Sequence, residues 1–393
     1  MARLLRPDEY AGLTAFFAVL ILEQTGGQVV QSATARLVAQ HAAHGDDPAL
    51  HSFVRRWTTR ILLLGGVPAL VVIVAAPFIR LGGFSPFAVA TLGATLFFAV
   101  VLTFTLGLLQ GLARFGWFGS VYIAMALARL VAGVALVLLF TQIQTPLRPQ
   151  HGAFLGAAIA LLVGAVGTLV PLTPLFRAAR GTMHEIHVAR SEVRFFLLAA
   201  VIFLAYAALT FIDGLLAPLR IPSEAGAYAA TITMAKVILF APIAVGFILL
   251  ERTANADALG RDADRYLFAA LGFVLVTSGA VAVAYLVAPA FLTSIIVGPQ
   301  YPLTASLIGP YGLAALSNAL LSLWVAYFVG RGMMGFGVLL ALAVAAEVGL
   351  IFLAGGDAAA MVRIVLTVSV AMQLAAVVRY LADRVTRRST APA

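Results

Sequence analysis

Long apolar runs constrain this chain more than any other feature of its sequence. Eleven runs of about 20 residues or more carry few charges, and each can cross the roughly 30 Å hydrocarbon core of a bilayer as an α-helix. Lipid cannot satisfy an unpaired backbone, so these runs predict an all-α polytopic membrane protein. The predicted spans cover residues 11–36, 57–79, 85–112, 116–141, 153–176, 195–217, 226–250, 266–290, 303–330, 333–355 and 358–380.

Composition excludes a soluble core with a charged surface, because 62% of the 393 residues are hydrophobic, 10% are charged and the mean hydropathy is +1.04. The chain has no cysteine, which rules out disulfides and thiolate chemistry. A net charge of +9 would suggest nucleic acid in a soluble protein. Here the arginines lie between apolar runs, where they contact lipid headgroups. We expect no nucleic acid partner, no cofactor, no bound metal and no enzymatic activity.

The basic residues also predict the orientation of the chain. Seventeen of them fall in one set of alternate loops and ends, and five fall in the other set. The positive-inside rule places the richer set in the cytoplasm, so we expect a cytoplasmic C-terminus in the cell membrane and an external Met1. The segment 48–57 is expected to lie on the inner surface as a short amphipathic helix.

A repeat relates the two halves of the sequence. RPDEYAG at 6–12 recurs as RIPSEAG at 220–226, and equivalent spans stand six apart, which indicates two parallel-repeat helical lobes. A span precedes the second copy, whereas the first copy follows almost directly on Met1, so the first helix of a twelve-helix pattern is expected to be missing. The predicted organisation is an N-terminal lobe of five spans at 1–176, a cytoplasmic interlobe linker at 177–193, and a C-terminal lobe of six spans with a short basic tail at 194–393.

Three segments resemble one known family. LLRPDEYAG resembles the segment between the first two helices of the polysaccharide and oligosaccharide flippases of the multidrug/oligosaccharidyl-lipid/polysaccharide (MOP) exporter superfamily. The run from Asp213 to Pro242 is similar to that family's seventh and eighth helices, with a basic residue at Lys236, and GPQY at 298–301 resembles its Gly-Pro-x-Tyr turn. The resemblance implies two helical lobes around a central cavity, and a substrate that is an oligosaccharide linked to a polyprenyl phosphate or pyrophosphate.

Two central cations mark the predicted interior. Lys236 is the only lysine beside 24 arginines, and it lies 10 residues after Gly226 and 14 before Leu250, about 15 Å and 21 Å from the ends of its span. Arg129 is similarly central in its own span. A charge at this depth costs roughly 2.5–3.5 kcal/mol, so each should face a hydrated cavity or a partner acid. We expect both to attract a phosphate group.

Polar side chains at helical spacing extend this interior. Gln24, Gln28 and Gln31 follow one another at i, i+4 and i+7, while Tyr228 precedes Lys236 by eight residues. Another span carries Tyr311, Asn318 and Ser322. Such rows suit sugar hydroxyls, or they form hydrogen bonds between helices. The residues predicted to bind substrate are Lys236, Arg129, Gln24, Gln28, Gln31, Tyr228 and Asn318.

Acidic residues within the spans have two interpretations. Glu23, Asp213 and Glu347 can pair with Arg129, Lys236 and Arg363 and tie helices together without a ligand. Alternatively, carboxylates such as Glu23 or Asp213 couple transport to protons or sodium. Glu23, Asp213, Glu347 and Arg363 are therefore predicted as coupling or charge-pair residues.

The sequence favours a flippase that moves a lipid-linked oligosaccharide or polysaccharide precursor, such as one for lipopolysaccharide, across the cytoplasmic membrane by alternating access. One alternative is a cation-coupled drug or metabolite exporter, for which an uncompensated acidic cavity would be expected. Another is a non-transporting scaffold of a polysaccharide assembly complex. The expected partners are membrane lipids, the lipid-linked substrate, and a polysaccharide polymerase or glycosyltransferases.

Overall fold

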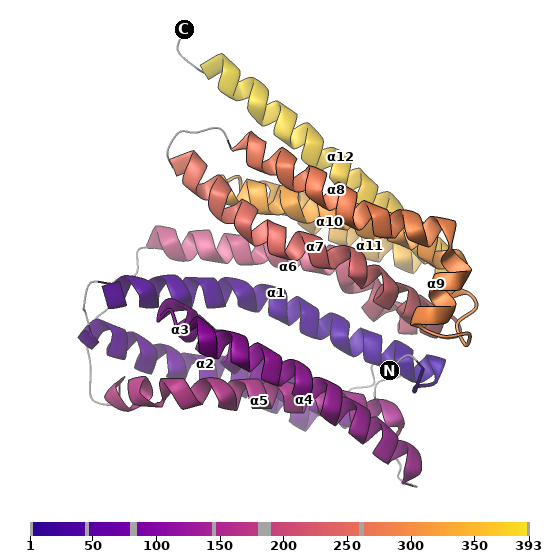
Figure 1. The fold of residues 1–393 in the computed structure, drawn as a ribbon, viewed down its shortest axis with the longest axis horizontal. Helices are drawn as coiled ribbons and strands as arrows, with labels where there is room; N and C mark the ends of the chain where they lie inside the picture. The colour runs from indigo at the N-terminus through magenta and orange to yellow at the C-terminus, as the bar shows by residue number, and fades with distance from the viewer. Residues whose placement is uncertain are drawn as a thin grey trace. The chain divides into compact units, whose positions relative to one another are not determined.

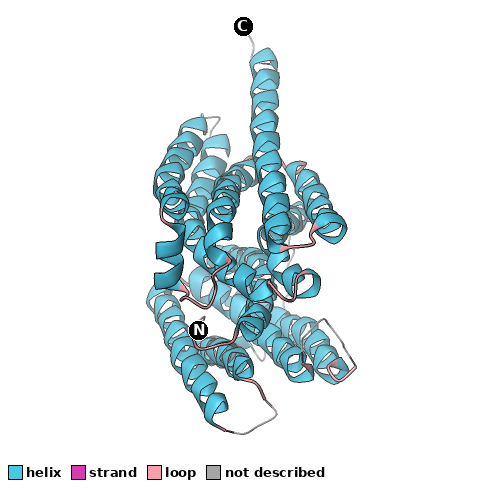
Figure 2. Cartoon of the chain, turned by 90° about the vertical axis from the view of Figure 1, so that its right-hand side faces the viewer, coloured by secondary structure: helices cyan, strands magenta, loops and turns pink. Residues whose placement is uncertain are grey.

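The computed structural model describes residues 3–43, 47–78, 85–143, 147–179, 190–258 and 263–390. These residues form helices joined by loops and turns, with no strand among them (Figure 2), which confirms the predicted all-α class. The helices are α1 (Pro7–Ala43), α2 (Asp47–Ala75), α3 (Pro86–Gly111), α4 (Phe115–Gln142), α5 (Pro149–Ala178), α6 (Arg190–Arg220), α7 (Ala225–Ala258), α8 (Asp264–Val287), α9 (Pro289–Ile296), α10 (Thr304–Gly330), α11 (Phe336–Ala354) and α12 (Ala358–Thr390).

Membrane-length helices dominate the fold. In the described residues, ten helices are long and apolar enough to cross a bilayer, and α7 adds an apolar piece, Ala225–Phe240. Each predicted span coincides with one of these eleven helices. The chain is therefore a multi-pass membrane protein, as the apolar runs predicted.

Two details differ from the sequence prediction. The segment 48–57 is not a separate surface helix but the first part of α2, and its Leu50 and Phe53 are buried in a core with Val38 and Leu108. The apolar face of this segment thus packs against neighbouring helices, while Arg55 and Arg56 are exposed. The second difference is a break after α8, because Ala288 leaves the helical conformation (φ −132°, ψ 51°) and Pro289 starts the short helix α9.

The described chain divides into two compact units (Figure 1). Unit 1 contains Arg3–Leu5 and Val19–Ala200, and unit 2 contains Arg6–Ala18 and Val201–Ala393. The division passes through α1 and α6 rather than through a loop. Most of the predicted interlobe linker, residues 180–189, lies outside the described residues.

In unit 1, glycines let helix backbones approach closely. A Cβ on Gly152 or Gly156 of α5 would lie 2.5 Å from the α4 backbone, at Leu136 and Gly133 respectively. A Cβ on Gly111 of α3 would lie 2.6 Å from a backbone oxygen of α1. Small residues at such crossings are the usual route to tight helix packing in membranes, where no hydrophobic force draws helices together.

Unit 2 is built around α10, which packs against α7, α8 and α12 and is buried along most of its length. The first turns of α1 also belong to this unit. Tyr10 donates a hydrogen bond to Thr233 of α7 at 2.7 Å, and its ring lies 5.9 Å from that of Tyr301. Tyr301 closes the predicted GPQY turn, in which Gly298 has φ 102°, a conformation that favours glycine.

One end of unit 2 is tied together by a single carboxylate. Asp264, at the start of α8, accepts hydrogen bonds from Tyr327 of α10 at 2.7 Å and from Tyr380 of α12 at 2.6 Å. Arg384 lies 3.9 Å from the same carboxylate. The three helices are therefore cross-linked at this end of unit 2.

Candidate functional site

A buried aspartate is the centre of the site in unit 2. Asp213 of α6 has no exposed surface. Its Oδ2 accepts hydrogen bonds from the hydroxyls of Tyr228 (α7) and Tyr311 (α10), each at 2.7 Å, and its Oδ1 accepts one from the Gly214 amide at 2.8 Å. The two tyrosine rings meet edge to face, 5.7 Å apart. Three donors from three positions thus hold this carboxylate, as burial of a charged group requires.

A second buried acid lies near the first. Glu347 of α11 also has no exposed surface, and it interacts electrostatically with Asp213. Within the described part of the chain, neither of its carboxyl oxygens has a hydrogen-bond partner. An ionised carboxylate sealed from water without partners costs several kcal/mol. Glu347 is therefore poised to hold a proton or to receive a cation.

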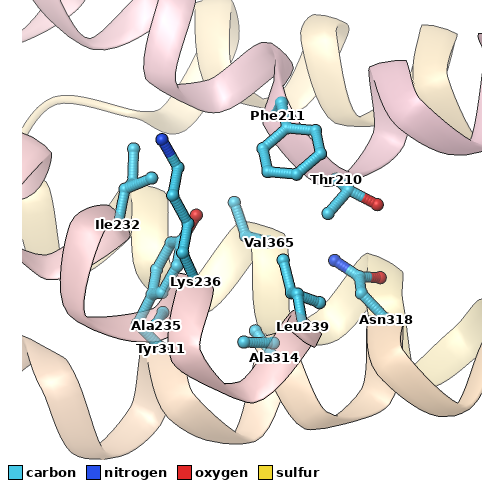
Figure 3. Close-up of a pocket in the computed structure, with 11 residues that line it drawn as sticks. Thr210, Phe211, Ile232, Ala235, Lys236, Leu239, Tyr311, Ala314, Asn318 and Val365 are labelled. Atoms are coloured by element: carbon cyan, nitrogen blue, oxygen red, sulfur yellow. The ribbon is translucent and has the colours of Figure 1, made fainter. Parts of the chain in front are cut away.

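A pocket in unit 2 is lined in part by Tyr311, the residue that donates a hydrogen bond to Asp213. It encloses about 270 Å³, counted with the part that opens to solvent. Its lining combines one cation, an amide and two hydroxyl groups with apolar side chains: Thr210, Phe211, Ile232, Ala235, Lys236, Leu239, Tyr311, Ala314, Ala315, Asn318 and Val365. Figure 3 shows Phe211 and Thr210 across the pocket from Lys236 and Asn318. The pocket can therefore bring a positive charge and hydrogen-bonding groups to a small anionic guest.

Four of the predicted site residues come together in this region. Lys236 and Asn318 line the pocket, while Tyr228 and Asp213 form the hydrogen bond described above. Glu347 joins them through its interaction with Asp213. The described hydrogen bonds of Asp213 come from tyrosines and a backbone amide, and its expected pairing with a base stays a prediction.

The row Gln24, Gln28 and Gln31 lies in unit 1, and its members have two different environments. Gln31 donates a hydrogen bond from Nε2 to Oε1 of Gln110 on α3 at 3.0 Å, which is the interhelical bond that the sequence left open as an alternative. Gln24 and Gln28 are exposed on α1, and Glu23 is half-buried. The row is therefore divided between helix packing and an open face.

The remaining predicted cations lie on exposed faces. Arg129 is exposed on α4, a helix of which few residues are buried within unit 1. Arg363 is exposed on α12 of unit 2. Lys236, which is half-buried, is thus the predicted cation that lines the pocket.

Sequence reasoning missed the role of Tyr311. The row Tyr311, Asn318 and Ser322 marked one polar face of α10, but the hydrogen bond to Asp213 joins residues 98 positions apart. Nothing in a single sequence gives that pairing. Phe211 and Thr210 were also missed, although they lie only two and three positions before the predicted Asp213.

The fold is shared with solved membrane transporters. An inward-facing multidrug resistance MATE family transporter of the MOP superfamily matches with TM-score 0.75 at 13% identity, over 98% of this chain and 92% of that chain. The eukaryotic MATE transporter AtDTX14 matches with TM-score 0.63 at 13% identity, over 97% and 93%. A MOP superfamily transporter from Pyrococcus furiosus, described by the reverse polarity of its binding pocket, matches with TM-score 0.62 at 16% identity, over 97% and 88%.

No protein-family model and no curated protein matches the chain. At 13–16% identity the structural likeness shows the fold alone. It confirms the predicted all-helical transporter-like fold, while the assignment to the MOP exporters and their polysaccharide flippases stays a prediction.

Proposed function

We propose that this protein is a membrane transporter that moves an anionic, lipid-linked oligosaccharide across the cytoplasmic membrane by alternating access. Ten membrane-length helices and a fold shared with MATE transporters support transport as the general activity. Such transporters have been solved in inward-facing and outward-facing conformations, and both match this chain. A polysaccharide polymerase or glycosyltransferases would make or use the transported precursor.

The pocket at Lys236 carries the proposal for an anionic substrate. The ammonium group belongs to a membrane-spanning helix, where charged side chains are rare and either pair with other polar groups or mark a substrate pathway. Asn318 and Thr210 add an amide and a hydroxyl, which suit phosphate oxygens and sugar hydroxyls. The pocket is small, so we infer that it receives the phosphate or pyrophosphate group while the polyprenyl chain stays in lipid.

A second candidate function is the cation-coupled export of drugs or metabolites. The observation in its favour is the buried pair Asp213 and Glu347, which gives unit 2 two acids close to the same pocket. Several proteins of the same fold are multidrug transporters by name. The two candidates differ in the sign of the guest, because an exporter of organic cations would use the acids for binding and would not need Lys236.

The test is translocation of a fluorescent polyprenyl diphosphate oligosaccharide by the full chain in reconstituted vesicles. Lys236→Met should slow translocation by about 10- to 100-fold, the equivalent of one charge-assisted hydrogen bond of about 1.5–3 kcal/mol. Lys236→Arg should retain most of the rate. Arg379→Met removes an exposed cation from α12 and serves as the matched control, with a rate close to that of the wild type. Equal rates for Lys236→Met and the control would overturn the proposal.

A further inference from the structure

We propose that Tyr311 couples the charge state of Asp213 to anion binding at Lys236, an inference that rests on the proposed function. Tyr311 contacts both the buried acid and the pocket. Its hydroxyl donates to Oδ2 of Asp213 at 2.7 Å, and its side chain lines the pocket that contains Lys236 and Asn318 (Figure 3). A change in the charge of Asp213 can therefore act on a bound anion through Tyr311.

The hydrogen bonds at Asp213 indicate how the binding of a proton would change its surroundings. Oδ2 accepts from two phenols, Tyr228 and Tyr311, and Oδ1 accepts from the Gly214 amide. An ionised carboxylate has room for these donors, but a protonated oxygen becomes a donor itself and keeps less acceptor capacity. Binding of one proton at Oδ2 therefore displaces one of the two phenols.

The two phenols are not equivalent once one of them is released. Tyr228 is fully buried and is not among the side chains that line the pocket. Tyr311 lines it, so its hydroxyl has a new acceptor within reach when an anion occupies the pocket. Protonation of Asp213 thus converts Tyr311 from a donor to the acid into a donor to the guest.

In the described residues, the titratable groups around Asp213 come from several helices. They are Tyr228 of α7, Tyr311 of α10 and Glu347 of α11, with Lys236 of α7 in the adjoining pocket. Protonation of Asp213 or of Glu347 removes a negative charge from unit 2. This change favours anion binding at Lys236 whether or not Tyr228 and Tyr311 are present. The specific contribution of Tyr311 is the additional gain that its hydroxyl supplies.

The coupling fixes the direction of the pH response. Anion affinity should rise as the pH falls, because the proton on Asp213 frees the phenol and removes a negative charge. By linkage, a bound anion favours proton binding at Asp213 by the same factor. Proton and anion therefore occupy the same loaded state of the transporter.

The test uses inorganic sulfate, whose charge is constant between about pH 5 and pH 8, and titration calorimetry of the purified full chain in detergent. Affinity of the wild type should rise about tenfold or more on acidification, as one hydrogen bond to a charged group supplies. Tyr285→Phe is the matched control, because it removes a buried phenol of unit 2 that donates to the Met234 carbonyl and not to Asp213, and it should keep this rise. Tyr311→Phe should keep at most about a two- to threefold rise, the part due to charge alone.

Three outcomes decide the matter, with thermal unfolding used to confirm that each variant is folded. An undiminished rise in Tyr311→Phe, or equal losses in Tyr311→Phe and Tyr285→Phe, would overturn the inference. If Lys236→Met also abolishes sulfate binding, the proposed function stands without the coupling. Sulfate binding that is unaffected by Lys236→Met would overturn both the coupling and the proposed anion site.

Discussion

Polar side chains serve different ends in the two units. In unit 1, Gln31 and Gln110 join two helices, and Arg129 lies on an open helix face. In unit 2, Asp213 and Glu347 are sealed from solvent beside a pocket that contains Lys236. Burial of ionisable groups in a membrane protein is expensive and usually marks function. The contrast therefore favours unit 2 as the location of the proposed binding site.

The largest expected effect is the loss of the Asp213 carboxylate. Asp213→Ala leaves two buried phenols without their acceptor, at about 1–3 kcal/mol each, so we expect a loss of stability of about 2–6 kcal/mol. Asp213→Asn keeps one acceptor and should lose less. The measurement is thermal unfolding of the purified protein in detergent.

The control for this comparison comes from unit 1. Gln24→Ala alters an exposed polar residue of α1 and should change stability by no more than about 0.5 kcal/mol. A wild-type unfolding temperature for Asp213→Ala would show that the buried network in unit 2 contributes no more than a surface residue.

Backbone packing in unit 1 gives the next largest effect. Gly156→Ala would place a Cβ 2.5 Å from Gly133 on α4, which forces two helices apart. We expect destabilisation of about 1–3 kcal/mol, as for overpacked cores. Gly119→Ala is the matched control on α4, because no atom lies within 4 Å of its added Cβ. It should be neutral or stabilising by up to about 1 kcal/mol. Equal unfolding temperatures for the two variants would contradict this packing.

Glu347→Gln separates function from stability within unit 2. The substitution keeps the size of the side chain but removes the group that can hold a proton or a cation. Because the described contacts of Glu347 include no hydrogen bond, stability should change by less than about 1 kcal/mol, while transport by reconstituted vesicles slows. A loss of stability as large as that of Asp213→Ala would instead identify Glu347 as a structural partner.

The smallest effect concerns the glutamine pair of unit 1. A double-mutant cycle of Gln31→Ala and Gln110→Ala should give a coupling energy of about 0.6 kcal/mol, the average for hydrogen bonds between membrane helices. Thermal unfolding of the two single variants and the double variant provides the cycle. A coupling energy near zero would show that the Gln31–Gln110 hydrogen bond does not stabilise the helices, and Gln31 would again be a candidate for substrate binding.

The sequence predicted the membrane helices well because lipid leaves few alternatives to an apolar helix. The turn at Gly332, where φ is 69°, falls in the gap between the predicted spans 303–330 and 333–355. Helix α9 was not predicted, since the apolar run continues through Pro289 and the break depends on that one residue. The start of α2 was misjudged because amphipathicity cannot distinguish a lipid surface from a protein neighbour.

The sequence singled out several residues of the candidate site but not their contacts. Lys236 was singled out by the cost of a central cation, and Asp213 by its position within a span. That Tyr228 and Tyr311 both donate to Asp213 is a tertiary fact. Helical spacing gives the face on which a side chain lies, whereas its partner on another helix depends on how the helices pack.

The most direct test of the account is the sign of the guest that Lys236 binds. Calorimetric titration of the purified full chain with a short-chain polyprenyl diphosphate, and separately with tetraphenylphosphonium, measures it. We predict that the diphosphate binds the wild type and that Lys236→Met weakens this binding about tenfold or more, while the organic cation binds poorly to both. Strong binding of the cation to the wild type, with diphosphate affinity unchanged in Lys236→Met, would contradict the account.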